Sequence, residues 1–257
     1  MVFVIGALCL VAGAAIGLVG GLMGIGGGLI AIPALGLALG MPQQLAQGTS
    51  LILVLPTILM AVRKYNQNSR IDWAVAGYGA GAAILFTWLG ARLALGVDPA
   101  LLRRSFAIFL CCVGVFYLWQ TYRMRRLAKS STAQAAVRPL KRGHGALLGM
   151  VGGTLGGFFG VGGAILIVPI ITSVFRYSQA NAQALALTMV IPGSTIALIT
   201  YTWAGQADWL IGLPMAVGSL LCVNLGVRLA YSFPERRLRA CFAALIFLTV
   251  IVLFIEG

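Results

Sequence analysis

The sequence predicts an all-α protein that crosses a membrane several times, and three observations lead to this fold class. Of the 257 residues, 60% are hydrophobic and only 9% are charged, with a mean hydropathy of +1.00. No soluble domain of this length buries so much apolar surface. The apolar runs are long and lack a two-residue alternation, which favours helices over a β-barrel. The Lys and Arg residues gather at the ends of these runs, as expected for membrane orientation.

The basic excess does not indicate nucleic-acid binding. The formal net charge is +13, but no basic and aromatic module accompanies it. The cysteines are odd in number, lie inside apolar segments and form no CxxC pair, so neither a metal site nor a disulfide framework is expected. They are Cys9, Cys111, Cys112, Cys222 and Cys241. No basic region precedes the first apolar run, so no cleaved signal peptide is expected.

An internal repeat organises the chain, because adding 136 to a residue number gives its counterpart. The motif GIGGG at 24–28 corresponds to GVGGA at 160–164, and each is followed by a proline five residues later. Composition bias gives scattered glycine matches, but not rarer residues at one offset. The rarer matched pairs are Gln43 and Gln179, Gln47 and Gln183, Pro56 and Pro192, Tyr65 and Tyr201, Asp72 and Asp208, and Arg92 and Arg228.

Each half therefore begins with a glycine-broken apolar stretch and continues with three ordinary spans. The broken stretches cover about 3–40 and 144–175. The expected spans are about 46–62, 73–95 and 104–121, and then about 182–200, 209–231 and 239–255. The first repeat is residues 1–121 and the second is 144–257. The linker, residues 122–143, carries seven Lys or Arg and is expected to be cytoplasmic.

The path of the broken stretches decides the topology. If each turns back near the midplane as a re-entrant hairpin, each half has three spans and the repeats are inverted. That arrangement places 15 of the 18 Lys and Arg on the cytoplasmic side, whereas eight full spans arranged as 4+4 place only 10 there. We therefore expect two inverted repeats, with each arm of a broken stretch reaching about the midplane. Residues 1–40 carry no charge, so the alternative of eight full spans stays open.

The broken helices suggest where a ligand binds. A helix N-terminus carries free N–H groups and about half a positive charge, and glycine lets an anion approach them. Two such ends, one from each repeat, form a midplane site typical of transporters. The predicted substrate-binding residues are Gly26, Gly27, Gly28, Gln47, Thr49, Ser50, Gly162, Gly163, Gln183 and Thr188. The expected helix-breaking residues are Pro33, Pro56, Pro169 and Pro192. The alternative is that the glycines only allow close helix packing.

The acidic residues all lie at the ends of segments. They are Asp72, Asp98, Asp208, Glu235 and Glu256. Asp72 and Asp208 are expected to cap the helices that follow them, and no carboxylate lies mid-span to carry a proton or bind sodium. Arg92 and Arg228 are expected to extend towards the membrane surface. No Ser-His, paired Asp or metal cluster lies within the spans, so the protein is not expected to be an enzyme.

These motifs resemble those of the sulfite exporter TauE/SafE family, also called the toluene sulfonate uptake permease group. The resemblance covers nearly the whole chain and includes the two glycine motifs, QGTSL at 47–51 and the basic linker. The second half departs from this pattern, with ALA at 184–186 in place of a polar TS-type pair. The resemblance implies a bacterial inner-membrane permease that exports a small sulfur-containing anion such as sulfite, sulfoacetate or another organosulfonate.

The expected function is thus membrane transport, with a small anion and the lipid bilayer as partners and no nucleic acid, cofactor or metal. The alternative is an anion-selective channel or a facilitator for another small oxyanion. The sequence leaves open which anion is moved, the direction, any coupling ion, the side of the N-terminus and the oligomeric state.

Overall fold

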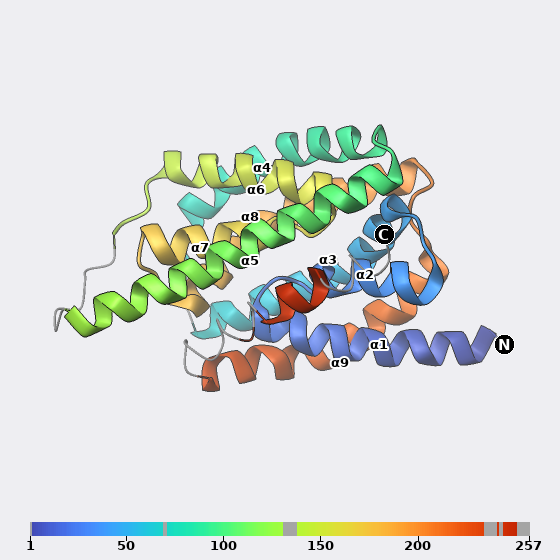
Figure 1. Ribbon diagram of the computed structural model, residues 1–257, viewed down its shortest axis with the longest axis horizontal. Helices are drawn as coiled ribbons and strands as arrows, with labels where there is room; N and C mark the ends of the chain where they lie inside the picture. The colour runs from blue at the N-terminus through green and yellow to red at the C-terminus, as the bar shows by residue number, and fades with distance from the viewer. Residues whose placement is uncertain (1, 69–70, 131–137, 234–240, 242–243, 251–257) are drawn as a thin grey trace.

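The protein is built from helices, as the sequence predicts. The computed structural model describes residues 2–68, 71–130, 138–233, 241 and 244–250, and this part of the chain contains no strand (Figure 1). The helices are α1 (Val2–Met23), α2 (Gly28–Leu39), α3 (Gln43–Asn68), α4 (Trp73–Leu95), α5 (Pro99–Ser130), α6 (Arg142–Phe159), α7 (Ala164–Val174), α8 (Gln179–Trp203) and α9 (Trp209–Ser232). Residues 244–250 are also helical.

Six of the described helices are long and apolar enough to cross a membrane. They are α1, α3, α4, α5, α8 and α9. Helices α2 and α7 have 12 and 11 residues, which is about 18 and 16 Å of helix and too short for a core about 30 Å thick. The expectation of a multi-pass membrane protein is therefore confirmed. The last expected span, about 239–255, lies largely outside the described residues.

Each glycine-broken stretch forms two helices of unequal length. Helices α1 and α6 precede the breaks and have 22 and 18 residues, or about 33 and 27 Å. The expectation that each arm reaches only the midplane is therefore wrong for α1, which is long enough to span. After the break the chain turns back, because a Cβ at Gly27 would lie 2.7 Å from the side chain of Ile16, about two turns before the end of α1.

Two long helix pairs hold these first arms in place: α1 packs along α9, and α6 packs along α4. Glycines at every fourth position let the backbones touch, and a Cβ on any of them would come within 3.0 Å of the partner helix. They are Gly13, Gly17 and Gly21, facing Met215, Ser219 and Val223, and Gly149, Gly153 and Gly157, facing Gly79, Ala83 and Thr87. We call these two sets the glycine ladders, and their role is close helix packing.

Helices α3 and α8 lie at the centre and join the two halves. Helix α3 packs against α2, α8 and α9, and α8 packs against α3, α4 and α7. About 72% of the α3 span and 61% of the α8 span are buried, more than in any other candidate span. Both glycine breaks therefore pack against this central pair.

The remaining expectations concern orientation. Helices α1 and α6 start at opposite ends of the molecule in Figure 1, and the inverted topology across a bilayer stays a prediction.

Helix α5 continues to Ser130, so the linker begins as helix, and residues 131–137 lie outside the described part. Asp72 and Asp208 cap α4 and α9 as predicted, each accepting two backbone N–H bonds. Arg92 is exposed and lies over the Trp88 ring.

The glycine ladders give a first testable prediction. Replacing Gly17 by Ala puts a methyl group onto the backbone carbonyl of Ser219, so overpacking should destabilise the protein by about 1–3 kcal/mol. A Cβ at Gly6 on the same helix meets nothing within 4 Å. Thermal unfolding of the purified variants should show a lowered Tm for Gly17→Ala and an unchanged Tm for Gly6→Ala. Equal Tm values would contradict the close contact between α1 and α9.

Candidate functional site

Two glycine loops form the starts of the short helices α2 and α7. Gly26 and Gly27 have φ of 74° and 88°, and Gly162 and Gly163 have φ of 81° and 73°. These are left-handed backbone conformations, which glycine adopts without strain. Gly27 is the N-cap of α2 and Gly163 is the N-cap of α7, and neither end has a side-chain cap. Both loops are buried.

The N-termini of α2 and α7 carry backbone N–H groups without a protein partner. On α2, the N–H groups of Ile30 and Ala31 donate to the Gly27 carbonyl at 3.1 and 3.0 Å. Within the described part of the chain, no acceptor pairs with the N–H of Gly28, Leu29 or Ile165. Buried backbone donors are nearly always paired in proteins. These ends are therefore equipped to bind a hydrogen-bond acceptor.

The two loops lie against each other at the centre of the molecule. A Cβ at Gly28 would lie 3.3 Å from Cα of Val161 and 3.5 Å from the carbonyl oxygen of Gly160. The side chain of Ile58 lies beside both Gly26 and Gly162. The structure thus brings together the predicted glycines of both repeats.

Two Tyr–Gln pairs tie each loop region to the opposite half, and we call them the clasps. Tyr65 donates to Oε1 of Gln183 at 2.8 Å, and Nε2 of Gln183 donates to the carbonyl of Met23 at 2.6 Å. At the counterpart positions, Tyr201 donates to Oε1 of Gln47 at 2.8 Å. Nε2 of Gln47 is fully buried and has no partner. The first clasp is satisfied, and the second leaves one amide donor free.

The predicted hydroxyl residues have partners inside the protein. Thr49 accepts a hydrogen bond from the backbone N–H of Asp208 at 2.9 Å. Ser50 and Thr188 donate to carbonyls of their own helices, at 2.8 Å in each case. The Thr49 contact positions the loop between α8 and α9. The hydroxyl groups of Ser50 and Thr188 already donate within α3 and α8, so these two side chains are not free donors.

The prolines do not end their helices. Pro33, Pro56, Pro169 and Pro192 lie inside α2, α3, α7 and α8, which all continue beyond them. The glycine loops, rather than the prolines, separate α1 from α2 and α6 from α7.

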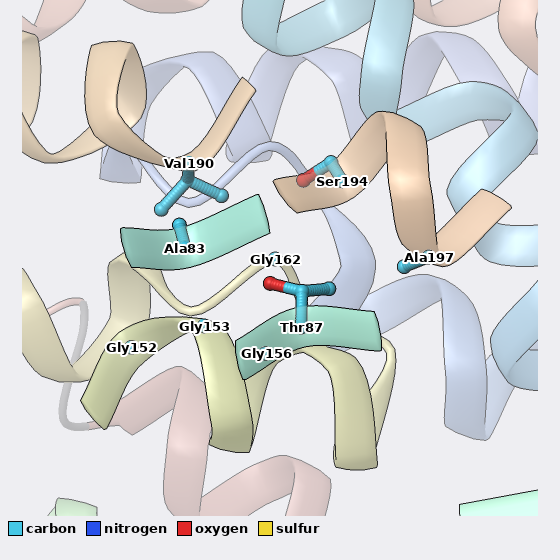
Figure 2. A pocket seen from close by; sticks show the side chains of 9 residues that line it. All are labelled: Ala83, Thr87, Gly152, Gly153, Gly156, Gly162, Val190, Ser194 and Ala197. Carbon is cyan, nitrogen blue, oxygen red and sulfur yellow. The ribbon is translucent and has the colours of Figure 1, made fainter. Parts of the chain in front are cut away.

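A small cavity lies beside the second glycine loop, between α4, α6 and α8 (Figure 2). Its volume is about 10 Å³, which is room for about one water molecule. Gly162, Thr87 and Ser194 line it, and Oγ of Ser194 is buried without a partner.

Sequence reasoning missed Thr87 and Ser194, which are not among the predicted substrate-binding residues. The 136-residue offset held the signal, because the counterparts of these two residues are the apolar Val223 and Ile58. The cavity beside the second glycine loop therefore carries two hydroxyl groups, one from each half, that the counterpart positions around the first loop lack.

The surroundings of the site are uncharged. Among the described residues, no Lys, Arg, Asp, Glu or His is buried, and no group of three His, Cys, Asp or Glu could hold a metal ion. A ligand here would meet helix dipoles, amides and hydroxyls rather than a buried charge.

Known proteins are similar to this chain over most of its length. The profile of a family described as sulfite exporter TauE/SafE matches residues 9–253. A probable membrane transporter protein of Methanocaldococcus jannaschii is 25% identical over 219 residues, 80% of this chain and 78% of that protein. One from Haemophilus influenzae is 27% identical over 205 residues, covering 78% and 75%. The probable membrane transporter protein YunE of Bacillus subtilis is 24% identical over 206 residues, covering 71% and 70%.

The clasps predict unequal effects of two equivalent substitutions. Gln183→Met removes two hydrogen bonds and leaves the buried carbonyl of Met23 unpaired, whereas Gln47→Met removes one bond and one unpaired amide. An unsatisfied buried polar group costs about 1–3 kcal/mol. Chemical unfolding should therefore show Gln183→Met to be less stable than Gln47→Met by about that amount. Equal stabilities would contradict the difference between the two clasps.

Proposed function

The chain belongs to the sulfite exporter TauE/SafE family of membrane transporters, and from this we propose that it exports a small sulfur-containing anion across the bacterial inner membrane. The proposed cargo is sulfite, sulfoacetate or another organosulfonate. Membership of the family supports the sulfur chemistry and the direction, and the site supports the negative charge.

The pair of buried, uncapped helix N-termini carries the proposal. Each terminus is equivalent to about half a positive charge, and the two starts, at Gly28 and Ala164, follow glycine loops that touch. Glycine lets an oxygen atom reach the N–H groups without a side chain in the way. Such a site attracts an anion without a buried Lys or Arg.

The donors around the loops suit an anion with several oxygen atoms. The backbone donors are joined by Nε2 of Gln47, a side chain whose Cβ and Cγ lie against Gly160, and by the Ser194 hydroxyl, which lies against Gly162. A sulfite or sulfonate group offers three oxygen atoms in a pyramidal arrangement, so it can accept bonds from several converging donors. Hydrogen bonds to a charged group are stronger than neutral ones.

The cavity is too small for the whole anion, so the proposal requires movement. A volume of about 10 Å³ holds about one water molecule, whereas a sulfite ion has four heavy atoms. The two glycine loops must therefore separate to admit cargo. In this view the structure is a closed conformation, and the cavity marks where binding begins.

Purified protein in liposomes tests the proposed cargo directly. Sulfite, sulfoacetate, taurine, sulfate and acetate are supplied one at a time to vesicles that hold labelled sulfite. Exchange should be fastest with sulfite or a sulfonate and slow with acetate, because acetate offers two oxygen atoms rather than three. Equal exchange with acetate would contradict specificity for sulfur oxyanions. In a second set of vesicles the unlabelled anion is inside and the labelled anion is added outside. Accumulation of label inside these vesicles indicates a carrier, and its absence indicates a channel.

Two single substitutions test the donors. Ser194→Ala removes a hydroxyl without a protein partner, and Gln47→Met removes an amide donor without one. Gln47→Met also removes the bond from Tyr201, whose hydroxyl keeps the Gly157 carbonyl as acceptor. Loss of one charge-assisted bond to the anion costs about 1.5–3 kcal/mol. The affinity for the transported anion should fall about ten- to a hundredfold, with Tm little changed. Isothermal titration and thermal unfolding of the same samples measure both quantities.

Thr195→Ala is the matched control, because the Thr195 hydroxyl donates to the carbonyl of Ile191 at 3.0 Å. Its affinity should stay near that of the wild type. Substitutions at Gly27 or Gly163 are not suitable, since a Cβ there would meet Ile16 or the carbonyl of Gly152 and disturb the fold. If both test variants bind as the wild type does, the anion site lies elsewhere.

A further inference from the structure

We propose that the open groove between the first turns of α4 and α6 binds one phospholipid with an anionic headgroup. The groove is formed by Trp73, Gly77, Tyr78, Gly81 and Ala82 of α4 and Ala146 of α6, and its volume is about 610 Å³. This site is separate from the glycine loops and does not depend on which anion is transported.

Two glycines in the groove have neither a packing nor a conformational role. A Cβ at Gly77 or Gly81 would meet nothing within 4 Å, and both lie in regular helix. Glycine weakens a helix interior, and a neighbour, Gly79, does have a packing role against Met189 and Gly145. Because Gly77 and Gly81 lack side chains, they leave the groove open.

The other half of the molecule shows that the repeat does not require this space. At the counterpart positions of Ala74, Gly77 and Gly81 the chain has Leu210, Leu213 and Val217. Those three side chains are exposed by 87%, 52% and 51%. The same helix surface is therefore a ridge on α9 and a groove on α4.

The dimensions of the groove suit one acyl chain. From Trp73 to Ala82, α4 rises about 13 Å, close to the thickness of about 15 Å of hydrocarbon in one leaflet. Trp73 and Tyr78 are 61% and 53% exposed. Exposed Trp and Tyr side chains are typical of the membrane interface, so they place the start of the groove at headgroup level.

The charge at the start of the groove favours an anionic headgroup. The guanidinium carbon of Arg142 lies 5.6 Å from the centre of the Tyr78 ring, and Lys141 precedes it at the start of α6. In the described chain, no carboxylate forms an ion pair with Arg142. Asp72 is the nearest acidic residue in sequence to the groove, and its Oδ1 already accepts from the N–H groups of Ala74 and Val75.

The predicted topology also favours an anionic lipid in the groove. The basic linker is expected on the cytoplasmic side, where the inner leaflet carries anionic lipids. Basic pockets between helices on that side bind lipid headgroups. The described acidic residues of a second copy, Asp72, Asp98 and Asp208, each already cap a helix, whereas a phospholipid supplies both an acyl chain and a negative charge, so a lipid fits the groove better.

Lipid binding to the purified full-length protein tests the proposal. Phosphatidylglycerol is added to detergent-solubilised protein, and phosphatidylcholine with the same acyl chains serves as the neutral comparison. Native mass spectrometry should show one tightly held phosphatidylglycerol. At a hundredfold excess over Kd, it should raise Tm by about 5–10 °C. Phosphatidylcholine should do neither.

Two variants locate the site. Gly77→Leu places in the groove the residue that α9 has at the counterpart position, and it should abolish the tightly held lipid and the Tm rise. Arg142→Gln should lower the affinity for phosphatidylglycerol about tenfold and leave phosphatidylcholine unaffected. Gly6→Leu, on α1 where a Cβ also meets nothing, is the matched control and should behave as the wild type.

Three results would overturn the proposal. Equal binding of both lipids would indicate non-specific contact, and retention of the lipid by Gly77→Leu would place it elsewhere. A dimer that Gly77→Leu converts to a monomer, without lipid loss, would make a second copy the occupant. None of these measurements uses a transported anion, so their failure leaves the proposed function untouched.

Discussion

Direct contact between helix backbones is the constraint on which the structure depends. Within a membrane, helices gain little from hydrophobic burial against each other, so their association relies on close packing. The glycine ladders supply it by bringing α1 onto α9 and α6 onto α4. The last turns of α1 and α6 then hold the glycine loops, since a Cβ at Gly20 or Gly156 would lie 2.6 Å from the backbone nitrogen of Gly27 or Gly163. The position of the candidate site thus follows from the packing of α1 onto α9 and of α6 onto α4.

Much of the fold could be predicted because it depends on local chemistry and on the repeat. The left-handed glycines, the caps at Asp72 and Asp208 and the central spans follow from residue type and from the 136-residue offset. The length of α1 could not be predicted in this way. No residue before Gly24 marks where a helix would turn back, because the segment carries neither charge nor proline.

The side chains of the site were harder to predict, because a hydroxyl group can donate to or accept from whichever partner the folded chain offers. Thr188 bonds to its own helix, while Thr49 holds a loop that lies 159 residues further along the chain. A comparison of the residues that the two repeats share also does not reveal functional residues that have no counterpart in the other repeat. The polar lining of the cavity, Thr87 and Ser194, lies where the repeat is broken.

The glycine content of α6 has a consequence for how the protein is made. Helix α6 is not apolar enough to be a candidate span, whereas its counterpart α1 is. A helix of low hydropathy enters a bilayer poorly by itself and needs a neighbouring helix to pack against its glycine-lined face. During synthesis its partner α4 precedes it by about fifty residues, so a docking surface is already in place when α6 leaves the ribosome. Helix α1 emerges some two hundred residues before its main partner α9, and its stronger hydropathy suits residence in the bilayer without that partner. The order of the helices along the chain thus matches the order in which each can enter the membrane.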